Sequence, residues 1–140
     1  MSHLKAPPRI LIVDDYPDIG DMFAAVLSKR GYSIETATNG EQALEIYQKA
    51  REQGRPFDLL ILDLALPGIS GIMVSEAVRA MGDQVKIAFL TAHSDDPMTG
   101  ARGAIANVVG IWRKPIEAAR LQANVACVLG DERVLGRASK

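Results

Sequence analysis

The sequence predicts an α/β domain in which helices cover both faces of a five-stranded parallel sheet. Along the 140 residues, five short apolar runs alternate with stretches of helical periodicity, which is the pattern of repeated βα units. The first run, residues 10–13, is apolar at every position, as expected of a strand that is buried on both faces. Both observations favour a doubly wound fold.

The first half of the chain predicts two strands and two helices. Residues 10–13 form the first strand, and apolar side chains then recur at helical spacing over residues 19–27 until Gly31 ends the helix. Residues 32–37 predict the second strand. A helix over residues 41–53 follows the Asn-Gly turn and ends at Gly54.

The middle of the chain continues the alternation. Residues 57–62 predict the third strand, which a Pro-Gly loop separates from the next helix. That helix carries an apolar face over residues 74–81, and Gly82 closes it. Residues 85–90 predict the fourth strand.

The last third predicts a weaker helix, a short strand and a final helix. We expect the fourth helix over residues 94–109, although Gly100 and Gly103 each weaken it by about 1 kcal/mol relative to Ala. Residues 110–113 predict the fifth strand. The final helix starts after Pro115, and we expect Cys127 on it to be part of the core.

Composition and charge narrow the class of protein. The 16 basic and 17 acidic residues give a net charge of −1, which argues against a broad nucleic-acid or anionic-lipid surface. One cysteine excludes an intramolecular disulfide, and no apolar run is long enough to span a membrane. We expect a cytoplasmic protein with a flexible N-terminus (1–8), one folded domain (9–130) and a polar C-terminal tail (131–140).

Polar side chains follow the apolar runs at the predicted strand ends. Asp14 and Asp15 follow the first strand, Asp63 the third, Thr91 the fourth and Lys114 the fifth. Because parallel strands share one carboxyl edge, these side chains should converge there, where open α/β sheets bind ligands. Two carboxylates 4 Å apart repel by about 4 kcal/mol at an effective dielectric constant near 20, and Mg²⁺ would relieve this. A metal, a carboxylate nucleophile, an ammonium and a hydroxyl can together handle a phosphoryl group.

At these residues the sequence resembles the receiver domain of two-component response regulators. The resemblance covers about Pro8 to Gly130 and implies the flavodoxin-like strand order 2-1-3-4-5. Its matching motifs are Ile12-Val13-Asp14-Asp15, Leu62-Asp63-Leu64 with Leu66-Pro67-Gly68, Leu90-Thr91-Ala92, and Lys114-Pro115.

The resemblance implies a role for each acidic residue. Asp63 matches the phosphoacceptor, which takes a phosphoryl group from a histidine kinase or a histidine phosphotransfer protein. Asp15 matches a direct Mg²⁺ ligand, and Asp14 is expected to act mostly through water. Asp63 and the backbone carbonyl of Ala65 complete the implied metal site.

The remaining site residues lie near the fourth and fifth strands. Thr91 would hydrogen-bond the transferred phosphoryl group, Lys114 would pair with it, and the Lys114–Pro115 peptide would be cis. The family usually carries Tyr or Phe three residues before the lysine, where this chain has Ile111, and Trp112 follows one place later. These residues leave open whether Trp112 replaces the usual aromatic switch residue.

Output is expected through proteins and not through direct nucleic-acid or membrane contact. The resemblance implies that a downstream protein binds the surface of the fourth helix, fifth strand and fifth helix, which is also a candidate homodimer surface. The chain is expected to accept and slowly lose a phosphoryl group without being an enzyme. Ala65 and His93 occupy positions associated with the rate of that loss.

Other functions fit the residues less well. A flavin-binding module would need hydroxyls and glycine in the first loop, where Asp14, Asp15 and Asp18 would repel a phosphate. An aspartyl phosphatase would need a second Asp at the position of Ala65. A degenerate receiver that acts without phosphorylation, and a fragment of a hybrid histidine kinase, remain alternatives.

Overall fold

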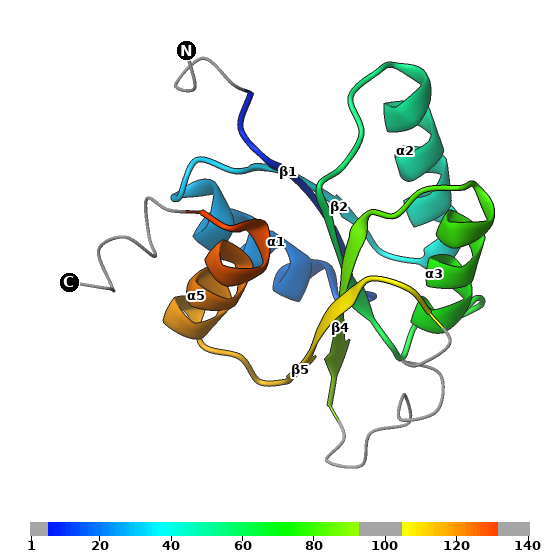
Figure 1. The fold of residues 1–140 in the computed structure, drawn as a ribbon. Coiled ribbons are helices and arrows are strands. Elements are labelled where there is room, and N and C mark those ends of the chain that lie inside the picture. Colours follow the sequence, from blue (N-terminus) through cyan, green and yellow to red (C-terminus); the bar gives the residue numbers. More distant parts are fainter. Residues whose placement is uncertain (1–5, 93–104, 132–140) are drawn as a thin grey trace.

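The computed structural model describes residues 6–92 and 105–131, which form one five-stranded parallel sheet (Figure 1). The strand order β2-β1-β3-β4-β5 confirms the predicted order. The strands are β1 (Arg9–Val13), β2 (Ser33–Ala37), β3 (Leu59–Asp63), β4 (Lys86–Thr91) and β5 (Val108–Arg113).

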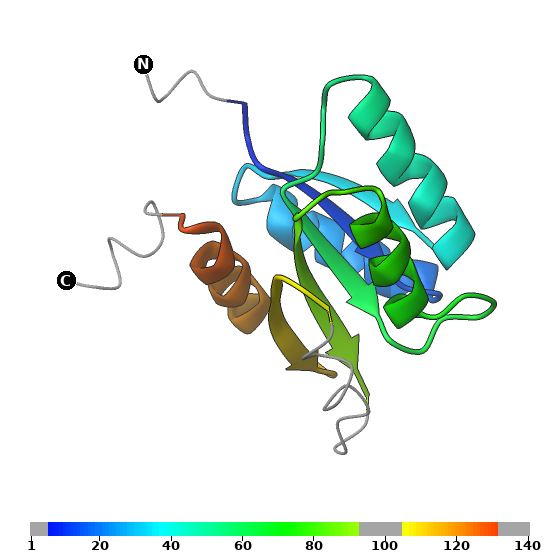
Figure 2. The same cartoon turned by 45° about the vertical axis from the view of Figure 1, so that its right-hand side comes forward.

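Helices cover both faces of the sheet, as the continuous apolar runs predicted (Figures 1 and 2). One face carries α1 (Pro17–Ser28) and α5 (Ala118–Leu129), and the other carries α2 (Gly40–Glu52) and α3 (Gly71–Ala80). Alternate strand residues therefore enter two separate hydrophobic clusters. Leu60 and Leu62 join the cluster under α2 and α3, whereas Ile61 joins the cluster under α1 and α5.

Local sequence signals set the helix starts. Pro17 begins α1, where its fixed φ suits the first helical turn. Asn39 caps α2 by accepting a hydrogen bond from the Gln42 N–H at 2.8 Å, and Ser70 caps α3 through Met73 at 3.2 Å. Helices α1, α2 and α5 begin within five residues of the end of the preceding strand, whereas residues 64–70 form a longer loop between β3 and α3.

The structure corrects the sequence prediction near β5. Most of the helix expected over residues 94–109 lies outside the described residues, but Val108 and Val109 belong to β5, and the strand therefore starts before residue 110. Asn107, at φ 58°, precedes the strand with a backbone angle that a helix cannot contain.

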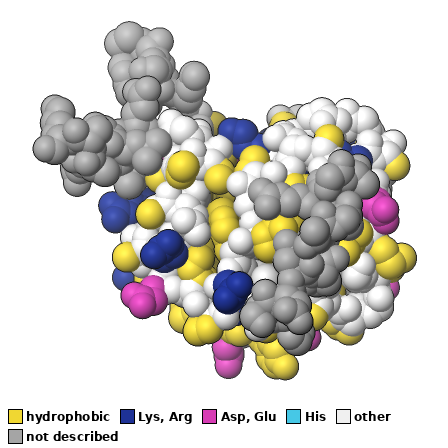
Figure 3. Space-filling model, turned by 60° about the horizontal axis from the view of Figure 1, so that its bottom comes forward, with side chains coloured by type: hydrophobic (Ala, Val, Ile, Leu, Met, Phe, Trp, Pro, Cys, Tyr) yellow, Lys and Arg dark blue, Asp and Glu magenta, His cyan; other side chains and the backbone are white. Residues whose placement is uncertain are grey.

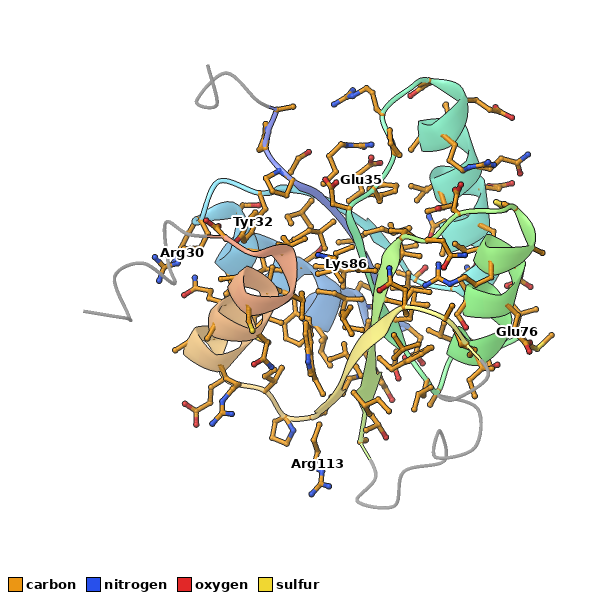
Figure 4. All side chains as sticks on the ribbon, viewed as in Figure 1. Arg30, Tyr32, Glu35, Glu76, Lys86 and Arg113 are labelled. Atoms are coloured by element: carbon orange, nitrogen blue, oxygen red, sulfur yellow. The ribbon has the colours of Figure 1, made fainter. Side chains whose placement is uncertain are left out.

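Two further side chains, Cys127 and Lys86, lie on or contact α5. Cys127 is exposed on α5 and is not part of the core, so that expectation is wrong. Lys86 is half-buried at the start of β4 (labelled in Figure 4), and its amino group donates to the Val128 carbonyl on α5 at 2.6 Å. This bond complements the carboxyl end of α5 with a positive charge. No helix within the described residues is both long and apolar enough to cross a bilayer.

Candidate functional site

The predicted site residues converge at the carboxyl edge of the sheet. Asp14 and Asp15 follow β1, Asp63 ends β3, Thr91 ends β4 and Lys114 follows β5. Carboxylate oxygens of Asp14, Asp15 and Asp63 all lie within 4.8 Å of one another. The acidic cluster expected from the strand ends is therefore present.

Lys114 is the counter-charge of this cluster. Its Nζ donates to Asp63 Oδ2 at 2.7 Å and to Asp14 Oδ2 at 2.8 Å. One ammonium against three carboxylates leaves a formal charge of about −2, the charge that a single divalent cation would neutralise. The donor set of hard oxygens therefore fits Mg²⁺.

Burial and hydrogen bonding shift the pKa values of Asp63 and Lys114. Asp14 is 1% exposed and Asp63 is 5% exposed. Burial raises the pKa of Asp63, and the hydrogen bonds from Lys114 and from the Ala65 N–H offset this only in part. Burial opposes the charge on Lys114, yet its hydrogen bonds to Asp14 and Asp63 outweigh this and raise its pKa. Lys114 therefore stays protonated at neutral pH.

Backbone groups fix the two buried carboxylates. The Ala65 N–H donates to Asp63 Oδ1 at 3.0 Å, and the Tyr16 N–H donates to Asp14 Oδ1 at 2.9 Å. Because Oδ2 of each carboxylate contacts Lys114, both are held at two points. The role of the Ala65 carbonyl as a metal ligand stays a prediction.

Gly71 is a site-supporting residue that the sequence prediction missed. A Cβ at this position would lie 2.4 Å from the backbone oxygen of Asp63, so only glycine allows α3 to start this close to the phosphoacceptor candidate. The signal that could have found it is a glycine placed directly after the capping Ser70.

The fourth and fifth strands place Thr91 and Lys114. Thr91 is buried, and its carbonyl accepts a hydrogen bond from the Lys114 N–H at 2.7 Å. The Lys114–Pro115 peptide is cis, which confirms the prediction. Arg113, directly before Lys114, extends outward at the bottom of the view in Figure 4. The Lys114 side chain thus lies inside the site, whereas the Arg113 side chain lies at the surface.

Ile111 and Trp112 point to opposite faces of the sheet. Ile111 packs with the cluster under α2 and α3, whereas Trp112 packs with the cluster under α1 and α5. Adjacent strand residues point to opposite faces. On the face where the family carries Tyr or Phe, this chain therefore presents Ile111. His93 lies outside the described residues.

Two hollows flank the site. One, of about 420 Å³, lies between α1 (Ile19, Met22 and Phe23) and the segment around Lys114 and Ile116. The other, of about 640 Å³, lies between β5 and α5 and includes Ile111, Trp112, Arg113 and Arg120. Figure 3 brings this edge forward and shows a band of hydrophobic side chains with Lys and Arg side chains beside it. The hollow beside Lys114 has mostly apolar walls, whereas the hollow between β5 and α5 is also lined by Glu117 and by the two arginines.

Comparison with known proteins identifies the family. Residues 10–126 match the family model described as "Response regulator receiver domain". The chain belongs to this family. The aspartates, Thr91 and Lys114 described above lie within the matched span, so the receiver domain contains the whole candidate site.

Relatives with curated descriptions agree. The chain is 36% identical over 121 residues to the "Uncharacterized transcriptional regulatory protein YrkP" of Bacillus subtilis, covering 86% of this chain and 49% of that protein. It is 34% identical over 87 residues to "Sporulation initiation phosphotransferase F" of the same organism, covering 64% of this chain and 66% of that protein. The chain thus spans about half the length of YrkP.

Solved structures share the fold. "Chemotaxis response regulator CheY4" of Vibrio cholerae superposes with a TM-score of 0.74 at 31% identity, over 87% of this chain and 98% of that one. The response regulator TrrA of Thermotoga maritima, solved "in complex with Mg(2+)-BeF", gives a TM-score of 0.71 at 35% identity, over 86% and 98%.

Proposed function

We propose that Asp63 accepts a phosphoryl group from a phosphohistidine of a histidine kinase or a histidine phosphotransfer protein. The observation that carries this proposal is the contact of one ammonium, Lys114, with the carboxylates of both Asp63 and Asp14. Response regulators as a family act in two-component signalling, and this chain keeps the acidic cluster, hydroxyl and lysine that phosphoryl transfer needs.

In the proposed transfer, a carboxylate oxygen of Asp63 attacks phosphorus, a P–O bond forms and the P–N bond to the donor histidine breaks. Mg²⁺ held by Asp14, Asp15, Asp63 and the Ala65 carbonyl would neutralise charge on the phosphoryl oxygens. Lys114 moves from the Asp63 carboxylate to a phosphoryl oxygen, and the Thr91 hydroxyl donates to another. The Ala65 N–H keeps Asp63 oriented throughout.

The phosphorylated state should persist, because Ala65 has no side chain that could orient a water for hydrolysis. Phosphoryl acceptance and slow loss would be self-catalysed, and the chain would turn over no external substrate. We propose that the resulting change at Thr91 reaches the surface around β5 and α5.

We propose that the phosphoryl donor and the downstream partner bind at different hollows. The donor protein would approach the hollow beside Lys114, whose apolar wall is formed by α1. A downstream protein, or a second copy of the chain, would bind the surface that includes the hollow between β5 and α5. We propose a cytoplasmic location and no direct contact with nucleic acid or membrane. A receiver that acts without phosphorylation and a part of a hybrid kinase are the alternatives.

Labelling with radioactive acetyl phosphate tests this function. We expect wild-type protein to acquire a Mg²⁺-dependent label that Asp63→Asn abolishes. Asp18→Asn, which changes an exposed acid on α1, is the matched control and should label normally. Label that persists in Asp63→Asn would overturn the assignment.

A further inference from the structure

Arg79, near the end of α3, joins two segments that precede neighbouring strands. Its Nη2 donates to the Val85 carbonyl at 2.7 Å, just before β4. Its Nε and Nη2 donate to the Ala106 carbonyl at 2.8 Å and 2.6 Å, just before β5. One guanidinium therefore holds the starts of β4 and β5 at a fixed distance.

Further contacts hold the same junction, which is formed by Arg79 and the segments before β4 and β5. Arg79 Nη1 donates to the Asp83 carbonyl at 3.1 Å, and the Asn107 side chain donates to the Gln84 carbonyl at 2.5 Å. The Asp83 carboxylate accepts from the Tyr47 hydroxyl at 2.6 Å, which ties the turn to α2. The planar, five-donor guanidinium suits a site with several carbonyls in different directions, which a lysine ammonium cannot span.

The junction lies beside an irregularity in the pairing of β4 with β5. Val108 pairs with Ile87, but Gly110 pairs with Ala88, so Val109 is an extra residue. A bulge of this kind can in principle slip, and a slip by one residue would move every later side chain to the opposite face. The segment held by Arg79 lies directly before this extra residue.

The register set at this point continues to Lys114. Thr91 pairs with Arg113, and the next residue, Lys114, donates its N–H to the Thr91 carbonyl. A one-residue slip displaces a strand by about 3.3 Å, which exceeds the hydrogen-bonding tolerance of an ammonium between two carboxylates.

We propose that Arg79 is a positioning residue for phosphoryl acceptance. By holding Ala106, it sets the register of β5 and thereby places the Lys114 ammonium on Asp63 and Asp14. It acts from the opposite end of β5 and touches none of the reacting groups. The expected effect of Arg79 on phosphoryl acceptance rests on the proposed function of Asp63. The expected effect of Arg79 on the position of Lys114 does not, and it can be measured in metal-free protein.

Two arginine variants separate this role from general stabilisation. Arg79→Gln removes the contacts to Ala106 and Val85. Arg51→Gln is the matched control, because Arg51 pairs with the Asp83 carboxylate of the same junction at 2.6 Å and donates to the Met81 carbonyl at the end of α3 at 3.3 Å. In metal-free protein, we expect the Lys114 amide to exchange with deuterium about tenfold faster in Arg79→Gln and at the wild-type rate in Arg51→Gln. Equal exchange in the two variants would overturn the proposal.

A double-mutant cycle tests the link to Lys114. We expect Arg79→Gln to slow acetyl phosphate labelling in the wild-type background but to change little when Lys114→Gln is already present. The same fold reduction in both backgrounds would show a merely structural role. If Arg79→Gln does not fold, Arg79→Lys serves in both measurements with the same expected directions. Failure of wild-type labelling would refute the function of Asp63, whereas amide exchange would still decide the role of Arg79.

Discussion

Ile111 and Trp112 are neighbours in β5, yet their side chains pack into different hydrophobic clusters on opposite faces of the sheet. Trp112 also covers Gly110, where an added Cβ would lie 2.4 Å from the indole Nε1. The indole is thus held between β5 and α5, and an aliphatic side chain faces the opposite direction.

Replacement of Trp112 should therefore affect stability more than phosphorylation. We expect Trp112→Ala to lower the free energy of unfolding by about 2 kcal/mol, less than for a fully buried aromatic residue because the side chain is half-buried. Urea unfolding followed by circular dichroism measures this. The rate of acetyl phosphate labelling should stay near the wild-type rate, and a loss as large as that of Lys114→Gln would contradict the assignment of faces.

Gly71→Ala should disturb the site directly. The added methyl would collide with the backbone oxygen of Asp63, and overpacking of this kind costs about 1–3 kcal/mol. We expect lower thermal stability and slower labelling. Gly20→Ala in α1 is the control, because its Cβ would meet only Thr36 atoms at 3.9 Å and alanine favours a helix. A normal labelling rate in Gly71→Ala would show that Asp63 tolerates displacement.

Protonation of Asp63 should couple stability to pH. Because burial raises the pKa of Asp63, the folded protein keeps this proton at a higher pH than the unfolded chain. The resulting stability is complete below the unfolded pKa and is lost as pH rises through the folded pKa, at about 1.4 kcal/mol per unit of difference.

We therefore expect metal-free Asp63→Asn to be more stable than wild type at neutral pH, with a gain that shrinks on acidification. Urea unfolding in EDTA, at pH values from acidic to neutral, measures the difference in free energy of unfolding between wild type and Asp63→Asn. Asp18→Asn, which changes an exposed acid, is the control. A gain that grows on acidification would contradict the raised pKa.

Magnesium should stabilise the wild-type fold, because a cation that binds only the folded state adds to its stability by mass action. We expect the melting temperature to rise with added MgCl₂ in wild type and in Asp21→Asn, an exposed acid on α1. Asp15→Asn, which removes a cluster carboxylate, should melt like metal-free wild type at every concentration. An undiminished rise in Asp15→Asn would exclude Asp15 as a ligand.

The parallel sheet and the convergence of the site could be predicted from the sequence because both follow from simple rules, whereas the strand order was implied by the family resemblance. Continuous apolar runs predict buried parallel strands, and parallel strands bring their carboxyl ends to one edge. Lys114 and Asp14 are 100 residues apart and still form the predicted cluster. The cis peptide before Pro115 was predicted through the family resemblance.

The details around β5 could not be predicted in the same way. Val108 and Val109 extend a helical pattern in sequence, but pairing with β4 makes them a strand. The extra residue at Val109 changes which face each later side chain takes, and no sequence pattern marks it. Arg79 reads as an ordinary charged residue at a helix end, because its carbonyl partners are defined only by the tertiary fold.

Trp112 is the only tryptophan of the chain and lies on the strand that leads to Lys114. Its fluorescence therefore arises from a single known position, between β5 and α5. Any change of packing there on addition of Mg²⁺, a phosphodonor or a binding partner can be followed in the unlabelled protein. Trp112 fluorescence thus reports on the β5–α5 surface, where a downstream protein is proposed to bind.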